Sequence, residues 1–348
     1  MTVQLAPGNP AVAGSRVSSF IKNEALRRGK RHSGLRTFLL PLGGASIAVA
    51  WAAVFGFNWL EVALLAGMFV LVTLGLEVGF HRLFAHHAFK APRAVQSILW
   101  VLALMAGQGR GLYWMASHRR HHSFSDTPDD PHTPYFRVTG QGTEILSGLR
   151  GFWHAHQGNT YTDYATNVAA FANDIKRNEA LMRLDKMYSF WVTMGIAIPG
   201  LVGALYYGTW MGAVSCALWG GPLRMFVQHQ LFFTNASLAH MVGEQPFDTG
   251  DRSRNNWYCA IWTFGSALQN THHAFPSSAY LRLRWYELDV AGMAIRVMAS
   301  FGLATDVRCP SPENVRAKLH KQGTVMTGLA KSASGSAREL SNAPAAKT

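Results

Sequence analysis

The sequence predicts an all-α integral membrane protein in which four transmembrane helices form two hairpins and a cytoplasmic helical cap holds a histidine-rich metal site. Two observations carry this prediction. Hydrophobic residues make up 49% of the 348 residues and charged residues only 15%, a low charged fraction for a soluble protein. Seven of the 15 histidines fall in three short clusters beside apolar stretches long enough to cross a bilayer. Imidazole is a usual ligand of iron, so the clusters indicate an iron site at a membrane surface.

The N-terminal segment, residues 1–36, is polar and ends in a cluster of basic residues. The cluster consists of Arg27, Arg28, Lys30, Arg31 and Arg36. Because basic segments beside a span are retained in the cytoplasm, this segment is expected to stay there and to orient the first span. It shows no charged-then-apolar signal peptide.

Four apolar stretches can cross the hydrocarbon core, since about 1.5 Å per residue gives each a length of roughly 30 Å. They are residues 37–57, 59–80, 187–207 and 209–233. Asn58 separates the first pair and Gly208 the second, so each pair is expected to form a helical hairpin. An even number of crossings places both termini and all three histidine clusters on the cytoplasmic side of the cell inner membrane.

The remaining segments are shorter or more polar. Residues 95–107 are apolar but too short to span, and two interpretations stay open: a re-entrant or surface-lying helix, and a buried helix of the cap. Residues 133–186 are polar and mixed, as expected of a water-facing cap. Residues 323–348 are rich in Ser, Ala, Gly and Lys, which predicts a disordered tail after a membrane domain at 37–322.

The formal net charge of +13 does not by itself indicate a nucleic-acid partner. The basic residues are scattered over loops and tails without the aromatic spacing of an RNA-binding face, and cytoplasmic retention explains those beside the spans. Membrane lipid is therefore an expected partner and nucleic acid is not. Cys216, Cys259 and Cys309 lie far apart in the sequence, which gives no basis for an iron–sulfur cluster or a zinc ribbon.

The histidine spacing lets imidazoles converge. Residues at i, i+3 and i+4 share one face of a helix, and two metal ions a few Å apart could divide such a set between them. This spacing occurs in His118, His121 and His122 and again in Gln269, His272 and His273. His81 and His86 stand about 140° apart around an ideal helix, so one of them is expected where the second span frays. A lone pair of helical histidines is more often a surface or core feature, but three clusters on one side of a membrane favour a metal site.

Six segments carry a family resemblance. They are GFHRLFAHHAF (79–89), HRRHHSFSDTPDDPH (118–132), WHAH (153–156), SLAHMVGEQPF (237–247), DRSRNNW (251–257) and THHAFPSSA (271–279). With these segments in this order, the chain resembles the membrane fatty acyl desaturases of the acyl-CoA delta-9 type, particularly their bacterial members. The resemblance covers roughly residues 37–318.

The resemblance implies a four-span helical protein whose cytoplasmic cap holds a diiron site of two Fe²⁺ ions. Such a protein is an O₂-dependent fatty acyl desaturase, which introduces a double bond into an acyl chain carried on coenzyme A, on acyl carrier protein or in a lipid. Breaking an aliphatic C–H bond needs a redox metal, and a closed apolar tunnel keeps water away from the oxidant. Candidate tunnel walls, each with ordinary aromatic packing as the alternative, are Trp100, Tyr113, Trp114, Trp257 and Trp262.

The resemblance also implies roles for individual residues. The expected metal ligands are His81, His86, His118, His121, His122, His240, Gln269, His272 and His273. His132 is expected to support the site or contact substrate, with a turn histidine as the alternative, and His154 and His156 are expected near the site without ligation. Arg252, Arg254 and Asn255 could meet a phosphate-bearing head group or make structural bonds within the cap. Packing or solvent is the expected environment of His32, His87, His229 and His320.

Two departures from the family pattern fall on the expected iron ligands. The third histidine box of the family opens with histidine, in a run like GEGWHNNHH, whereas this chain has Gln269, as front-end desaturases do. Ala236 stands where the family has an asparagine thought to reach one iron through water, and Asn235 points about 100° away unless the helix is distorted. One iron is therefore expected to be held less tightly or to be more open, and Gln269→His is expected to be tolerated or to raise iron occupancy.

Three outcomes follow from these departures: desaturation, a shift to hydroxylation or triple-bond formation in a specialised pathway, or lost activity. A rival from another class is a haem-binding membrane electron carrier with two histidine ligands, but the predicted spans carry almost no histidine except His229. The chain shows no fused cytochrome b5 or ferredoxin segment, so a separate electron donor of the ferredoxin, rubredoxin or cytochrome b5 type, with its reductase, is expected.

Overall fold

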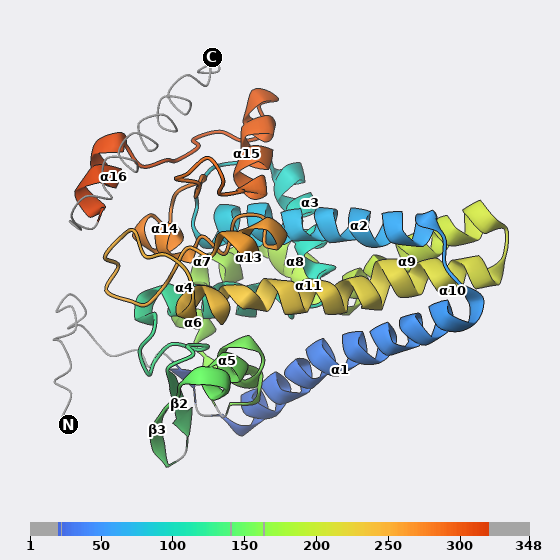
Figure 1. The fold of residues 1–348 in the computed structure, drawn as a ribbon, viewed down its shortest axis with the longest axis horizontal. Helices are drawn as coiled ribbons and strands as arrows, with labels where there is room; N and C mark the ends of the chain where they lie inside the picture. The colour runs from blue at the N-terminus through green and yellow to red at the C-terminus, as the bar shows by residue number, and fades with distance from the viewer. Residues whose placement is uncertain (1–19, 22, 140, 163, 320–348) are drawn as a thin grey trace.

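The computed structural model describes residues 20–319 except residues 22, 140 and 163. Long helices form an extended bundle, and shorter helices, loops and small sheets form a cap at one end of it (Figure 1). The bundle contains α1 (Glu24–Phe55), α2 (Trp59–Leu74) with its π-helical continuation η1 (Gly75–Ala85), α3 (Arg93–Leu104), α9 (Tyr188–Tyr207), α10 (Trp210–Leu218), η3 (Trp219–Leu223) and α11 (Arg224–Phe232).

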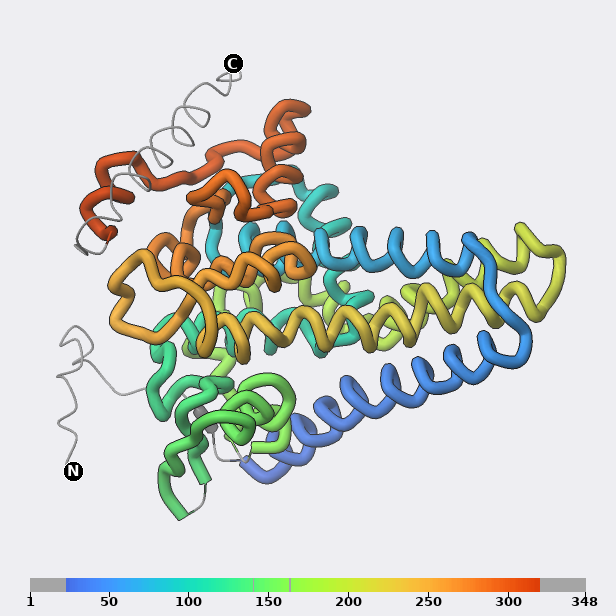
Figure 2. The backbone as a smooth tube through the Cα atoms, viewed as in Figure 1, coloured from blue at the N-terminus to red at the C-terminus, as the bar shows by residue number. Residues whose placement is uncertain are grey.

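The cap comprises residues 111–186 and 233–319. Its first part holds α4 (Gly111–Phe124), α5 (Gly148–His156), η2 (Gly158–Tyr161), α6 (Val168–Phe171), α7 (Asn173–Arg177) and α8 (Glu179–Lys186). Its second part holds η4 (Phe233–Asn235), α12 (Leu238–Met241), α13 (Trp257–Trp262), α14 (Gln269–Ala274), α15 (Val290–Ser300) and α16 (Pro312–Lys318). The backbone trace brings these two parts side by side although the second hairpin separates them in sequence (Figure 2).

The prediction of an all-α protein is wrong in one detail, because four short strands are present. β1 (Phe20–Ile21) pairs with β4 (Ala165–Thr166), and β2 (Phe136–Thr139) pairs with β3 (Gly142–Ile145). Both pairs are antiparallel, and the second is a local hairpin in which Phe136 lies opposite Ile145. Two-stranded sheets have marginal stability on their own, so these strands are minor additions to a helical protein.

Within the described part of the chain, three helical segments are long and apolar enough to cross a membrane: residues 24–55, 59–85 and 188–207. The first begins 13 residues before the predicted span, because the Asn23 side chain caps the helix by accepting from the amides of Ala25 (3.0 Å) and Leu26 (3.2 Å). The basic end of the predicted N-terminal segment is therefore helical, and the boundary at residue 36 falls inside α1.

The fourth predicted span is helical from residue 210 to residue 232 but is divided into α10, η3 and α11. The π-helical turn contains Pro222, which has no amide proton for the helical ladder. α10 packs closely along α9, since a Cβ added at Gly203 would lie 2.4 Å from the carbonyl oxygen of Gly212. Gly208 joins the two helices with a positive φ of 65°, as a turn glycine between them predicts.

A buried arginine ties the second hairpin to α3. Arg224 is fully buried, and its guanidinium donates to the carbonyls of Gly220, Met105 and Gly195 and to the side-chain oxygen of Gln228. The Gly195 carbonyl has no helical partner, because Pro199 lies four residues later and lacks an N–H. Arg224 therefore satisfies backbone groups that proline and a helix end leave unpaired.

Replacing Arg224 by methionine is expected to lower the thermal stability of the protein in detergent. Methionine keeps an apolar stem but donates no hydrogen bond, so the buried carbonyls of Met105 and Gly195 each lose a partner at about 1–3 kcal/mol. The unfolding midpoint measures the effect, and Arg183→Met at a site 78% exposed is the control. An unchanged midpoint in Arg224→Met would show that the carbonyls find other donors.

The apolar stretch at 95–107 forms α3, which packs against η1. A Cβ added at Gly75 would lie 2.5 Å from the Ala103 amide nitrogen, so the two backbones approach closely. The packed face of α3 consists of Leu99, Trp100, Ala103 and Leu104. α3 is only partly buried, because Ile98 is 59% exposed, and both interpretations of this stretch stay predictions. Its Trp100 packs against Phe80 and Phe84 of η1.

Candidate metal centre

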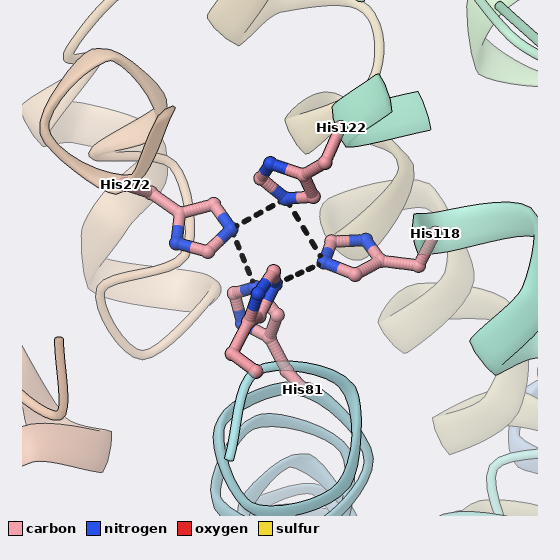
Figure 3. A group of neighbouring side chains, drawn as sticks. His81, His118, His122 and His272 are labelled. Atoms are coloured by element: carbon pink, nitrogen blue, oxygen red, sulfur yellow. Dashed lines mark hydrogen bonds between the residues drawn. The ribbon is translucent and has the colours of Figure 1, made fainter. Parts of the chain in front are cut away.

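Five histidines from three elements converge at the junction of the bundle and the cap. Each offers one ring nitrogen, and these nitrogens lie within 4.8 Å of one another. The five-histidine cluster consists of His81, His86, His118, His122 and His272. Figure 3 shows four of these rings turned toward a common point from η1, α4 and α14. Segments nearly 200 residues apart in sequence thus build one site.

The π-helical geometry of η1 places both histidines of the first box in this cluster. The His86 amide donates to the His81 carbonyl (3.2 Å), an i to i+5 bond that returns the fifth residue to the same face. His81 Nε2 lies 2.9 Å from His272 Nε2, and His86 Nε2 lies 2.6 Å from His118 Nε2. His86 is the first residue after η1, so one of the two histidines lies at the end of the second span's helix as expected, and the locally widened helix turns both toward this cluster.

A second group, the three-histidine cluster, consists of His121, His240 and His273. α4 sends His118 and His122 to the first cluster and His121 to the second, and α14 divides His272 and His273 in the same way. The Nε2 atoms of His121 and His273 lie 3.2 Å apart. The i, i+3, i+4 spacing allows one helix to supply histidines to two neighbouring sites, and the structure shows this arrangement in α4.

Burial favours the neutral form of the histidines that α4 and α14 supply to the five-histidine cluster. Burial, and then the neighbouring imidazoles, hold the pKa values of His118, His122 and His272 well below the usual value of 6.5. Neutral imidazole is the form that binds a metal ion, and adjacent lone pairs aimed at one point are stabilised by a cation between them. The donor set of this cluster therefore fits a borderline metal such as iron.

Four carboxylates orient the histidines from behind, and sequence reasoning missed them as part of the site. Each accepts a hydrogen bond from a histidine Nδ1: Glu77 from His81 (2.9 Å), Asp130 from His121 (2.9 Å), Asp126 from His240 (2.9 Å) and Asp251 from His273 (2.5 Å). This contact favours the tautomer that leaves the Nε2 lone pair free for a metal. The position of Glu77 could have indicated its role, because it is a charged residue in an apolar span, four residues before His81.

Three buried polar atoms, one in the three-histidine cluster and two on residues that line the cavity reaching His121, have no hydrogen-bond partner among the described residues. They are His240 Nε2, Gln269 Oε1 and Asn235 Oδ1. Asn235 belongs to the 3₁₀ turn η4, so the helix is locally distorted at this residue. Asn235 lines the same cavity as Gln269 and Ala236. Buried polar atoms are rarely left unpaired, so their gathering here indicates a site for a ligand.

The supporting histidines of the sequence analysis lie around this cluster. His132 Nδ1 donates to Asp130 Oδ1 (3.2 Å), so one carboxylate holds both His132 and His121. Burial lowers the pKa of His132 to about 3. His154 and His156 line the adjacent cavity and lie outside both clusters, and His156 contacts Ser237 and Gln230.

The candidate head-group residues make contacts within the cap and do not line the cavity. The Arg252 guanidinium lies 4.2 Å from the centre of the Tyr135 ring, and Arg254 donates to the Gly243 carbonyl. Asn255 is buried, accepts from the Thr271 amide (3.0 Å) and donates to its hydroxyl (2.8 Å). Asn255 thereby fixes the start of α14, which agrees with the structural alternative for this residue.

A cavity of about 780 Å³ adjoins the two clusters. It reaches His81, His118 and His121 at one side and runs along a face of α1 at another. Small residues four apart line that face of α1: Ala25, Gly29, Ser33 and Thr37. The cavity is long enough to follow three turns of a helix and has the size of a ligand site.

Among the predicted tunnel walls, Tyr113 and Trp114 line the cavity. Trp100, Trp257 and Trp262 do not line this cavity, and their contacts agree with the alternative of ordinary packing. Trp100 is fully buried behind η1 against Phe80 and Phe84, Trp257 stacks on Tyr258, and Trp262 is half exposed. An aromatic side chain fills a core as readily as it lines a tunnel, which is why residue type alone could not separate the two.

The remaining histidines lie away from the clusters. His32 is exposed, His87 pairs with the exposed Asp174, and His229 contacts the carbonyls of Ala106 and Thr37. His320 lies outside the described residues. Within the clusters, neighbouring Nε2 atoms lie only 2.6–3.2 Å apart, which leaves no space for a porphyrin between them. The haem alternative is therefore wrong for the histidine pairs at these distances.

Membrane-length helices, together with two histidine clusters able to hold metal ions at the junction with the cap, define a helical membrane protein with a candidate metal centre. Residues 57–296 match the fatty acid desaturase family, and the chain belongs to that family. It is accordingly a membrane-bound oxidoreductase that acts on fatty acyl chains.

The relatives include an acetylenase and acyl-lipid desaturases. The chain is 37% identical over 301 residues to a hex-5-enoyl-[acyl-carrier protein] acetylenase of Moorena producens, covering 86% of this chain and 93% of that protein. It is 32% identical over 263 residues to an sn-1 stearoyl-lipid 9-desaturase of Synechocystis, covering 75% and 76%. It is 31% identical over 268 residues to delta-9 acyl-lipid desaturase 2 of Arabidopsis thaliana, covering 76% and 80%.

Proposed function

We propose that the two clusters hold two Fe²⁺ ions and that the chain desaturates a fatty acyl substrate with O₂. The proposed ligands are His81, His86, His118, His122 and His272 for one ion, and His121, His240, His273 and Gln269 for the other. The convergence of imidazoles backed by carboxylates is the single observation that carries this proposal. When bound, the diiron centre would supply the O₂-derived oxidant that an unactivated C–H bond requires.

The chain's own residues orient the ligands and bind the acyl chain beside them. The carboxylates fix the imidazole tautomers, and the walls of the cavity exclude water from the reacting methylene groups. Asn235, His132, His154 and His156 border the cavity and are proposed to support the site or contact substrate. Arg252, Arg254 and Asn255 are proposed to hold the cap together, given their internal contacts.

The proposed topology has four spans, with α10, η3 and α11 together forming the fourth. The three membrane-length helices and the continuous helical run from residue 210 to residue 232 support it. Both termini and the cap would then lie on the cytoplasmic side of the inner membrane, where basic segments are retained. The proposed division is a basic N-terminal segment at residues 1–36, whose end is part of α1, a membrane domain at residues 37–322, and a tail at residues 323–348, which lie outside the described residues.

A separate electron donor completes the proposed reaction. Removal of two hydrogens supplies two electrons, and reduction of O₂ to two waters needs two more. We propose a ferredoxin, rubredoxin or cytochrome b5 type carrier with its reductase, since a one-electron carrier can dock on the cytoplasmic side of the cap.

Triple-bond formation is a second candidate function. The identity to the Moorena acetylenase, which covers most of both chains, favours it. Purified protein with a reducing system would be given a long-chain acyl group and a terminal-alkenyl group, each on acyl carrier protein and in phospholipid. Mass spectrometry then separates the outcomes: new double bonds support desaturation, an alkyne supports acetylenase activity, and absence of any modified chain together with absence of iron contradicts both.

Replacing Gly29 by phenylalanine is expected to reduce turnover of a long acyl substrate about tenfold. Gly29 lines the cavity on α1, and a Cβ added there meets no atom within 4 Å, so the ring can enter the space proposed for substrate. Gly43→Phe is the matched control, because Gly43 also lies on α1 with open space around it but does not line the cavity. Initial rates at several substrate concentrations measure the effect, and equal loss in both variants would contradict the proposed path.

A further inference from the structure

The two histidine clusters differ in the donors they offer. The first supplies five imidazole nitrogens, each within 4.8 Å of the others. The second supplies three imidazoles, and the cavity that reaches its His121 is also lined by Gln269 and Asn235, whose side-chain oxygens are unpaired among the described residues. Imidazole suits iron, whereas an amide oxygen is a harder and weaker donor for it. An ion in the second cluster therefore has fewer strong ligands.

The two amide side chains are buried and line the cavity that reaches the second cluster. Gln269 is 5% exposed and Asn235 is 8% exposed, and both side-chain oxygens lack a hydrogen-bond partner among the described residues. Both residues line the same cavity as His121. Leaving a buried polar group unpaired is unfavourable, and His240 Nε2, within the three-histidine cluster, is unpaired as well. A cation in this cluster would give His240 Nε2 a partner.

We propose that the two metal positions fill in sequence. The five-histidine cluster binds the first ion tightly, and the three-histidine cluster, completed by Gln269 Oε1 and Asn235 Oδ1, binds the second ion more weakly. This inference rests on the proposed function, because it assumes that both clusters hold iron. It makes the second position the exchangeable one, from which metal is lost first.

Chelator titration of the full-length, iron-loaded protein in detergent, under anaerobic conditions, tests the proposal. Iron remaining on the chain is measured against the free Fe²⁺ set by the chelator. We expect one ion per chain to leave at a free Fe²⁺ concentration at least tenfold higher than the other. Two ions that leave together would overturn the inference and leave the proposed function intact, whereas protein that never binds iron would refute the proposed function itself.

Two variants assign the weaker position. Gln269→His adds an imidazole and is expected to tighten the weaker ion about tenfold while the tighter ion keeps its affinity. Asn235→Leu keeps a side chain that branches at Cγ but removes the amide oxygen. It is expected to weaken the binding of the same ion. Gln96→His on α3, outside both clusters and the cavity, is the matched control and is expected to change neither. A change confined to the tighter ion in Gln269→His would overturn the assignment.

Discussion

Replacing His272 by alanine is expected to abolish product formation, with a loss of at least about 100-fold. His272 is 1% exposed, and its Nε2 lies 2.9 Å from that of His81 and 2.8 Å from that of His122. Loss of groups that merely orient a metal ligand typically costs 10–100-fold, so loss of a ligand is expected to cost at least as much. Acyl products and iron per chain are measured on protein from the membrane fraction.

His87→Ala is the control for this experiment. His87 follows His86 in the first box, but it is exposed and pairs with Asp174 on the surface, so its loss is expected to leave product and iron near wild type. His121→Ala repeats the test on the other cluster, with the same expected loss of product. Near-normal product from His272→Ala, with the protein still in the membrane, would show that the ligand assignment is wrong.

The apolar runs predicted the membrane-length helices well, because a membrane-spanning segment must pair its backbone N–H and C=O groups internally and contains few charged side chains. The predicted span at 187–207 differs from α9 by one residue. The start of α1 was missed because its polar first turns are held by the cap and not by lipid. Lys30 donates to the carbonyls of Asn159 and Tyr164, and Gly34 lets α1 approach Thr160. Such contacts join residues more than 120 positions apart and leave no periodic signal in the sequence.

The candidate site was predictable where spacing is local and not where contacts are distant. The i, i+3, i+4 pattern correctly grouped the histidines of α4, although only the fold shows that they divide between two clusters. The shared face of His81 and His86 depends on the π-helix, which the spacing rules of an ideal helix exclude. Asp126 meets His240 across 114 positions, so its role as an orienting carboxylate could not be read from neighbours in the sequence.

Replacing Asp130 by asparagine is expected to lower metal affinity at the three-histidine cluster by about 10–100-fold. The Asp130 side chain is fully buried, and it accepts from Nδ1 of His121 (2.9 Å) and of His132 (3.2 Å). Burial alone would raise the pKa of this carboxyl, but the facing imidazoles outweigh it and hold the pKa well below its usual range. An asparagine amide carries no charge and can turn its NH₂ toward His121, which moves the histidine proton to Nε2 and removes the lone pair offered to metal.

Iron content distinguishes this effect from general unfolding. In Asp130→Asn the five-histidine cluster keeps all of its imidazoles, so we expect about one iron per chain, a normal amount of protein in the membrane and strongly reduced product. Asp306→Asn is the control, because Asp306 pairs with Lys90 at an exposed site where an ion pair contributes little. If Asp130→Asn retained two irons and full turnover, the carboxylate would serve only to cap its loop. If both irons were lost together, the clusters would act as a single cooperative unit, because orientation of one histidine in the second cluster would then govern the first.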